Sequence, residues 1–282
     1  MRMANIGGRL TLVTPRGPVD VAGASGGRFG PDPQDAFRDW AGFASWAAGA
    51  LSTAAVSEPE AGAVRGAPVP APRQIFAIGL NYRDHCAEAG LAVPGEPAVF
   101  TKFVTSLTGP EHDVELPEGW VDWEVELVVV IGREAHRVSR ADAWSYVAGL
   151  TAGQDLSERR LQLAGPAPQF SLGKSYPGFA PLGPELVTPD EFADPDDLEL
   201  GCGLAGGEVF QKSRTSQMVF DVPELVERLS AVCPLLPGDL IFTGTPAGVG
   251  GARDPKRFLR PGEVLESWIE GVGTLRNTMR AA

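Results

Sequence analysis

Short hydrophobic runs, separated by turns rich in glycine and proline, recur along most of the chain and predict a β-rich protein. Near the start, residues 10–13 and 19–21 contain short apolar alternations on either side of a turn at residues 15–18, a pattern typical of a β-hairpin. Apolar residues then recur at helical spacing from Phe37 to Leu51. This pattern predicts one helix packed on the hairpin.

A change of composition marks the end of this first unit. Residues 58–72 are dominated by proline, alanine and glycine, which disfavour both helices and central strands. We therefore predict a small N-terminal α+β domain that closes with this linker, over residues 1–72. A larger domain is predicted over residues 73–282.

The larger domain is expected to consist mainly of strands, which makes the predicted fold class β-rich α+β. Strands are expected at residues 74–79, 124–131 and 240–242, with a terminal strand pair within residues 262–275. One helix is expected to begin with the capping-box pattern of Ser139 and Asp142 and to continue through Ala148. Gly149 and Gly153 would end that helix.

Two carboxylates interrupt the most hydrophobic of these runs. Glu124 and Glu126 lie just before Leu127 to Ile131, and side chains two residues apart on a strand point to the same face, about 7 Å apart. Two like charges in one place are costly unless a cation lies between them, so a bound metal ion is one explanation. A solvent-exposed strand face that carries two glutamates is the other. The pattern alone leaves both open.

A third carboxylate follows 29 residues after Glu126, far enough for the chain to return to the same place through a helix. With Asp155 added, the site would offer three oxygen ligands and leave positions for water or substrate, as Mg²⁺ or Mn²⁺ prefers. Alternatively, Asp155 is a cap or turn residue, which is common for an aspartate in a loop.

His85 and Glu88 form a candidate catalytic pair. They lie three residues apart in a segment predicted to be a short helix capped by Asn81 or Asp84, so their side chains share one face. A carboxylate beside an imidazole orients the ring and makes it a better base, suited to removing a proton from water. A surface ion pair without a catalytic role is the alternative.

Composition and charge restrict the partners. A net charge of −12 argues against nucleic acid, and an acidic substrate would need local lysine or arginine and a metal ion. The three cysteines are far apart and form no C-x-x-C motif, which fits a reducing compartment. Because no apolar run reaches about 18 residues and the start lacks a signal-peptide core, we expect a cytoplasmic protein without membrane contact.

Five motifs, in order along nearly all of residues 73–282, resemble the fumarylacetoacetate hydrolase family. They are Gly79 to His85 with Glu88, Asp122 to Leu127, Asp155 to Gln162, Lys174 within Gly-Lys-Ser, and Pro237 to Pro246. Each motif alone is weak, whereas five in this order are highly specific. The resemblance implies the family's mixed β-sandwich or β-roll in the C-terminal domain and usually a homodimer.

The resemblance also implies roles for individual residues. It places an Mg²⁺ or Mn²⁺ ion on Glu124, Glu126 and Asp155, and makes His85 and Glu88 a water-activating pair on a lid that orders when substrate binds. The other matching positions contact substrate or the reacting oxygens: Tyr82, Arg159, Gln162, Lys174, Gly244 and Thr245. Arg160 stands where many relatives have Asp, and Ala205-Gly206 where many have Asn-Gly. These departures leave the substrate contacts near both loops open.

The expected function is hydrolysis of a carbon–carbon bond in a 2,4-dioxo acid of the acylpyruvate or fumarylacetoacetate type. A metal ion chelated by the carboxylate and 2-oxo oxygen would stabilise an enolate leaving group. His85, oriented by Glu88, would deprotonate water, while Lys174 and the loop at Thr245 would stabilise the oxyanion. Two alternatives stay open: decarboxylation of oxaloacetate or isomerisation of a 2-hydroxy-dienedioate at the same site, and an inactive metal-dependent binding protein.

Overall fold

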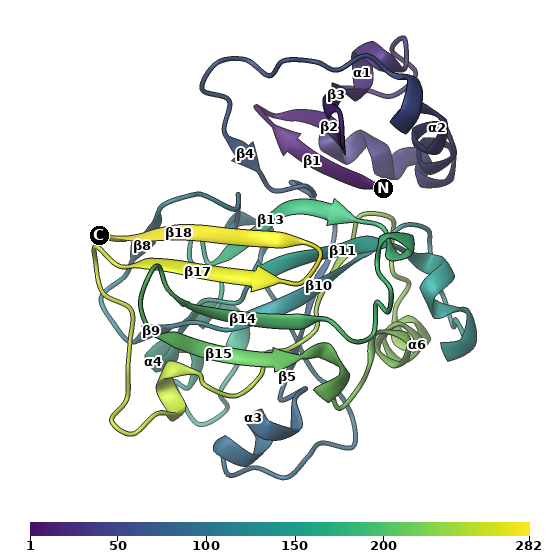
Figure 1. Ribbon diagram of the computed structural model, residues 1–282. Coiled ribbons are helices and arrows are strands. Elements are labelled where there is room, and N and C mark those ends of the chain that lie inside the picture. The colour runs from purple at the N-terminus through teal and green to yellow at the C-terminus, as the bar shows by residue number, and fades with distance from the viewer.

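The computed structural model describes residues 1–282 and contains one large sheet, one smaller sheet packed against it and a two-stranded ladder (Figure 1). The large sheet has 11 strands, nine of which lie in the order β3-β2-β1-β13-β11-β10-β16-β5-β6. Their bounds are β3 Gly17–Asp20, β2 Arg9–Thr14, β1 Arg2–Ile6, β13 Ala180–Val187, β11 Val147–Gln154, β10 Val125–Ile131, β16 Leu240–Phe242, β5 Ile75–Gly79 and β6 Ala98–Thr101. The short strands β4 (Arg65–Gly66) and β7 (Leu107–Thr108) pair with β1 and β13.

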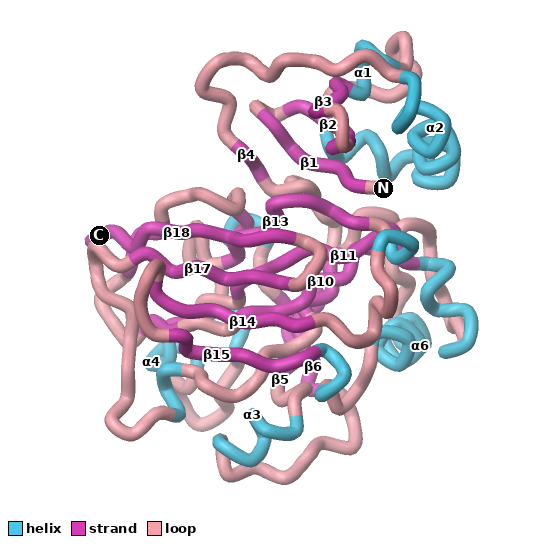
Figure 2. Tube along the Cα trace, viewed as in Figure 1, coloured by secondary structure: helices cyan, strands magenta, loops and turns pink.

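The second sheet has five strands, and helices are few and short (Figure 2). In spatial order, the five strands are β15 Val209–Arg214, β14 Glu199–Leu204, β17 Val264–Ile269, β18 Gly273–Ala281 and β8 Val114–Leu116. The ladder joins β9 (Val121–Asp122) to β12 (Ser157–Glu158). The α-helices are α1 Val21–Ala24, α2 Trp40–Thr53, α3 Arg83–Glu88, α4 Arg159–Gln162, α5 Phe170–Gly173 and α6 Val222–Val232. None of them has the length and hydrophobicity needed to span a lipid bilayer.

Strand β10 lies at the centre and is buried on both faces. Val125, Leu127 and Val129 point into a core shared with the five-stranded sheet and α6. Val128 and Val130 point into a second core that includes the N-terminal segment. A strand covered on both faces reads as a continuous hydrophobic run, which explains why this stretch lacks polar alternation.

The N-terminal segment is built around the predicted hairpin. Strands β2 and β3 pair as expected, and the predicted helix is α2, which follows a 3₁₀ helix at Pro33–Asp39. Strand β1 was not predicted. It pairs with β2 and also with β13 (Arg2 with Val187), so the N-terminal strands continue the large sheet. The division into two domains after residue 72 stays a prediction.

The helix predicted from Ser139 through Ala148 is wrong in its second half. Residues Arg140–Tyr146 form a 3₁₀ helix, and Val147–Gln154 is strand β11, hydrogen-bonded to β10 and β13. A side chain on Gly149 would meet the Val187 carbonyl oxygen at 2.6 Å, and one on Gly153 would meet Val128 at 2.5 Å. These glycines allow close packing within the sheet core, and tertiary pairing overrides the local helical signal.

The predicted cap of α3 is also wrong. Tyr82 occupies the N-cap position, and no side chain caps the helix. The Asn81 amide instead donates to the carbonyl oxygens of Phe220 and Thr243, at 2.9 and 2.7 Å. Asn81 therefore ties the start of this segment to the strand that precedes the glycine-rich loop.

Candidate active site

Three buried carboxylates meet where strands β10 and β11 come together. Glu124 precedes β10, Glu126 lies within it and Asp155 follows β11 directly. The antiparallel register pairs Val125 with Gln154, which brings Asp155 beside the two glutamates. One oxygen atom from each carboxylate lies within 4.8 Å of the other two. The predicted triad is therefore assembled, by a strand and not by the helix that we expected.

The chemistry of this donor set fits a divalent cation. Glu126 is 1% exposed, and its carboxylate accepts one hydrogen bond, from the Gly244 amide at 2.8 Å. Burial, reinforced by the negative charges of Asp155 and Glu124, raises the pKa of Glu126 well above its usual range. A hard cation held by three carboxylate oxygens would relieve this repulsion, and Glu124, Glu126 and Asp155 are the residues that would hold it.

Two buried lysines neutralise part of the cluster. The Lys174 ammonium lies 2.7 Å from Glu124 Oε2 and 2.5 Å from Asp155 Oδ2. Burial works to lower the pKa of Lys174, but Asp155 and Glu124 outweigh it, so the pKa is raised. Lys102 was missed by sequence reasoning. Its ammonium lies 2.6 Å from Asp155 Oδ1 and donates to the Lys174 carbonyl oxygen. A lone lysine among Val99, Phe100, Phe103 and Val104 was the available signal.

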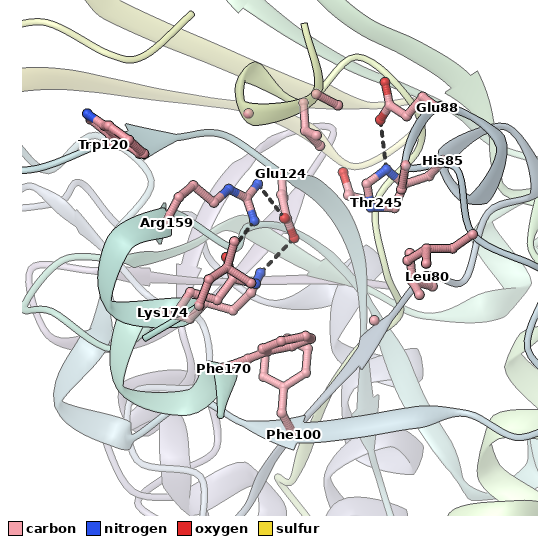
Figure 3. Close-up of a pocket in the computed structure, with 18 of the residues that line it drawn as sticks. Leu80, His85, Glu88, Phe100, Trp120, Glu124, Arg159, Phe170, Lys174 and Thr245 are labelled. Atoms are coloured by element: carbon pink, nitrogen blue, oxygen red, sulfur yellow. Dashed lines mark hydrogen bonds and ion pairs between the residues drawn. The ribbon is translucent and has the colours of Figure 1, made fainter. Parts of the chain in front are cut away.

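Arg159 completes the charge balance (Figure 3). Its guanidinium lies 2.7 Å from Glu124 Oε1 and 2.6 Å from Asp122 Oδ1, and it donates to Gln162 Oε1 at 2.8 Å. Burial would raise the pKa of Glu124, but Lys174 and Arg159 bring it down to about 2. For Asp122, burial outweighs Arg159 and raises the pKa to about 6. Of Asp122, Glu124 and Glu126, Glu124 is therefore the carboxylate that stays ionised most firmly.

His85 and Glu88 form the predicted acid–base pair on α3. His85 Nδ1 lies 2.7 Å from Glu88 Oε1, and Glu88 Oε2 accepts a hydrogen bond from the Gly248 amide at 2.9 Å. The carboxylate is thus held between α3 and the glycine-rich loop. With Nδ1 engaged, the imidazole has Nε2 left for a ligand.

One cavity of about 550 Å³ contains most of the predicted site residues. In Figure 3 the acid–base pair and Trp120 lie on opposite sides of Glu124. Thr245 lines the wall, where its hydroxyl donates to the Val125 carbonyl oxygen and accepts from Gln211. The predicted residues that line the cavity are His85, Glu88, Glu124, Arg159, Gln162, Lys174 and Thr245.

Two predicted substrate contacts lie outside this lining. Tyr82 is completely buried, and its hydroxyl makes no hydrogen bond. Gly244 adopts a φ of 97° and directs its amide to Glu126. A side chain at Gly244 would lie 2.7 Å from Asn81 Cβ, so only glycine fits there. Their direct contact with substrate stays a prediction.

The fold and this site define an enzyme of a known family. The model of the C-terminal domain of fumarylacetoacetate (FAA) hydrolase matches residues 74–280. The chain belongs to the fumarylacetoacetate hydrolase family, which confirms the predicted family and the β-rich α+β fold.

Individual relatives carry different activities. The chain is 45% identical over 213 residues to the mitochondrial oxaloacetate tautomerase of Bos taurus, covering 75% of this chain and 68% of the relative. A solved protein from Mycobacterium smegmatis, named as a candidate HpcE protein, is 56% identical, with a TM-score of 0.94 and full coverage of both chains. Maleylpyruvate hydrolase from Sphingobium sp. SYK-6, solved with manganese(II) and pyruvate, is 30% identical, with a TM-score of 0.81 and full coverage of both.

Proposed function

We propose that this protein is a divalent-metal-dependent enzyme that interconverts the keto and enol forms of a 2-oxo acid. The observation that carries the proposal is the shared cavity, whose wall includes Glu124 of the carboxylate triad and the acid–base pair of His85 and Glu88. These two components accelerate enolisation, the cation by polarising the 2-oxo oxygen and the base by removing the C3 proton. The similarity to oxaloacetate tautomerases supports this choice.

The roles of the residues follow from their contacts. A Mg²⁺ or Mn²⁺ ion on Glu124, Glu126 and Asp155 would polarise the 2-oxo group and acidify the C3 proton. His85 Nε2 takes that proton, while Glu88 stabilises the imidazolium through Nδ1. The imidazolium then returns the proton to the 2-oxo oxygen, which yields the enol. Arg159 and Gln162 line the cavity beside Glu124, where their side chains would contact the substrate carboxylate.

Proton exchange at C3 tests this proposal directly. In D₂O, purified enzyme with Mg²⁺ or Mn²⁺ should accelerate deuterium incorporation at C3 of oxaloacetate and 2-oxobutanoate, followed by NMR. Removing the metal with EDTA should abolish the acceleration. If no 2-oxo acid exchanges with either metal, tautomerisation is not the function.

Hydrolysis of a 2,4-dioxo acid is the second candidate. The acid–base pair could activate water instead of abstracting a carbon-bound proton, and maleylpyruvate hydrolase shares the whole fold. Release of pyruvate from acetylpyruvate or maleylpyruvate, coupled to lactate dehydrogenase, would establish it. An inactive binding protein would instead bind these acids tightly in calorimetry without converting any of them.

We also propose a homodimer, on the family resemblance, and light scattering of the purified protein tests it. The cytoplasmic location stays a prediction, and the similar tautomerase of Bos taurus is named as mitochondrial.

A further inference from the structure

Four basic side chains line the cavity, and two of them are not neutralised. Arg159 and Lys174 are paired with the buried carboxylates. Arg160 and Lys256 form no ion pair, and their side chains make no hydrogen bond. In a chain with a net charge of −12, two unpaired cations in the lining of one cavity are available for an anionic ligand.

Both free cations lie against the same indole ring. Arg160 Cζ is 4.6 Å and Lys256 Nζ is 5.9 Å from the centroid of the Trp120 ring. Trp120 is stacked on Phe258, with centroids 5.6 Å apart and ring planes 7° apart. Cation–π contact restricts where each charged group lies, so both charges stay beside the same indole ring.

The backbone that carries this group is well anchored. The buried Glu158 carboxylate accepts hydrogen bonds from the backbone amides of Trp120 at 2.8 Å, Arg160 at 3.1 Å and Leu161 at 2.7 Å. In the loop that carries Lys256, the Gly251 amide donates to Asp122 Oδ2 at 2.6 Å. These contacts fix the backbone next to the two cations, which lowers the entropy lost when an anion binds to their side chains.

We propose that Arg160 and Lys256, arranged around Trp120, bind a second carboxylate of the substrate, so that the enzyme selects dicarboxylic 2-oxo acids. This inference rests on the proposed function, because it assumes that the first carboxylate and the 2-oxo group occupy the metal end of the cavity. Trp120 lies on the side of Glu124 opposite the acid–base pair (Figure 3). A second carboxylate directed toward Trp120 leaves C3 accessible to His85.

Oxaloacetate and 2-oxobutanoate form a matched pair of probes, because both have four carbons and a C1 carboxylate, and only oxaloacetate has a second carboxylate, at C4. The double variant Arg160→Gln with Lys256→Gln should lower kcat/KM for oxaloacetate roughly 10- to 100-fold, mostly through KM. The value for 2-oxobutanoate should not change. Arg160→Lys keeps the charge and should retain most of the preference. The control is Arg133→Gln, which removes an exposed arginine that lies 3.9 Å over Tyr146, outside the cavity.

Equilibrium binding separates this inference from the proposed function. Dissociation constants for both acids, measured by tryptophan fluorescence with Mg²⁺, should show weaker binding of oxaloacetate alone in the double variant. Unchanged oxaloacetate binding, or an equal loss for both acids, overturns the subsite. If the wild-type enzyme exchanges neither acid but the oxaloacetate constant still depends on Arg160 and Lys256, the subsite stands and tautomerisation fails.

Discussion

The Lys102 ammonium lies 2.6 Å from Asp155 Oδ1, although both side chains are completely shielded from solvent. Removing Lys102 would leave the buried Asp155 carboxylate with only one ammonium partner, Lys174 at 2.5 Å, and a buried charge with less compensation is costly. Lys102→Met should therefore lower the free energy of unfolding by about 3–5 kcal/mol, measured by urea denaturation. Lys212→Met removes an exposed lysine paired with Glu199 and should change stability by less than about 1 kcal/mol. Equal effects of the two substitutions would contradict a structural role for Lys102.

Removing one metal ligand should separate metal binding from folding. Glu126→Gln keeps the shape of the side chain and disrupts no ion pair. In wild-type protein, Mg²⁺ or Mn²⁺ at 100 times its dissociation constant should stabilise the fold by about 2.7 kcal/mol. Thermal melts with metal and with EDTA should show this gain in the wild type and in Glu115→Gln, an exposed control, but little of it in Glu126→Gln. A full metal-induced gain in Glu126→Gln would exclude Glu126 as a ligand.

The acid–base pair should act in turnover without affecting metal binding. His85→Gln and Glu88→Gln are expected to slow C3 exchange by about 10²- to 10⁴-fold, because each removes proton transfer or the orientation of the base. The metal-induced shift in melting temperature should stay as in the wild type. His112→Gln alters an exposed histidine and should leave the exchange rate unchanged. Normal exchange in His85→Gln would assign the base elsewhere.

Strand β11 should tolerate no side chain at Gly153. An added Cβ would lie 2.5 Å from Val128 and 2.7 Å from Phe242, so Gly153→Ala should destabilise the protein by about 1–3 kcal/mol. Gly49→Ala is the matched control in α2, where a Cβ meets nothing within 4 Å. It should stabilise the helix by about 0.5–1 kcal/mol. Chemical denaturation measures both, and the same sign for the two would contradict the packing argument.

Asp239 should make stability depend on pH. Burial raises the pKa of Asp239, although its carboxylate accepts hydrogen bonds from Gln74 and the Leu236 amide. Between the ordinary value of about 3.9 and the raised value, the folded protein holds a proton that the unfolded chain has lost. The contribution of Asp239 to the free energy of unfolding is fully present at lower pH. It declines as pH rises through that window, by at most about 1.4 kcal/mol per pH unit. Asp239→Asn cannot titrate, so its stability relative to the wild type should increase across the window in urea titrations. A constant difference would contradict the raised pKa.

Local patterns along the chain were sufficient to predict the family, the central strand β10 and the C-terminal hairpin. They also identified the carboxylates at positions 124, 126 and 155. Hydrophobic runs and motif order are properties of neighbouring residues, so they can be read without knowing the fold. The pairing of His85 with Glu88 followed for the same reason, since both lie on one turn of α3.

Tertiary structure decided the features that depend on distant partners. The helical pattern that begins at Ser139 was expected to continue through Ala148, yet hydrogen bonds to β10 and β13 make residues 147–154 a strand. Strand β1 pairs with β13 through Arg2 and Val187, which are 185 positions apart, and Lys102 meets Asp155 across 53 positions. The sequence shows the basic residues Arg160 and Lys256, but only the structure shows that they form no ion pair with a carboxylate. The free energies of these arrangements depend on long-range pairing and on burial, and no short stretch of sequence contains both partners.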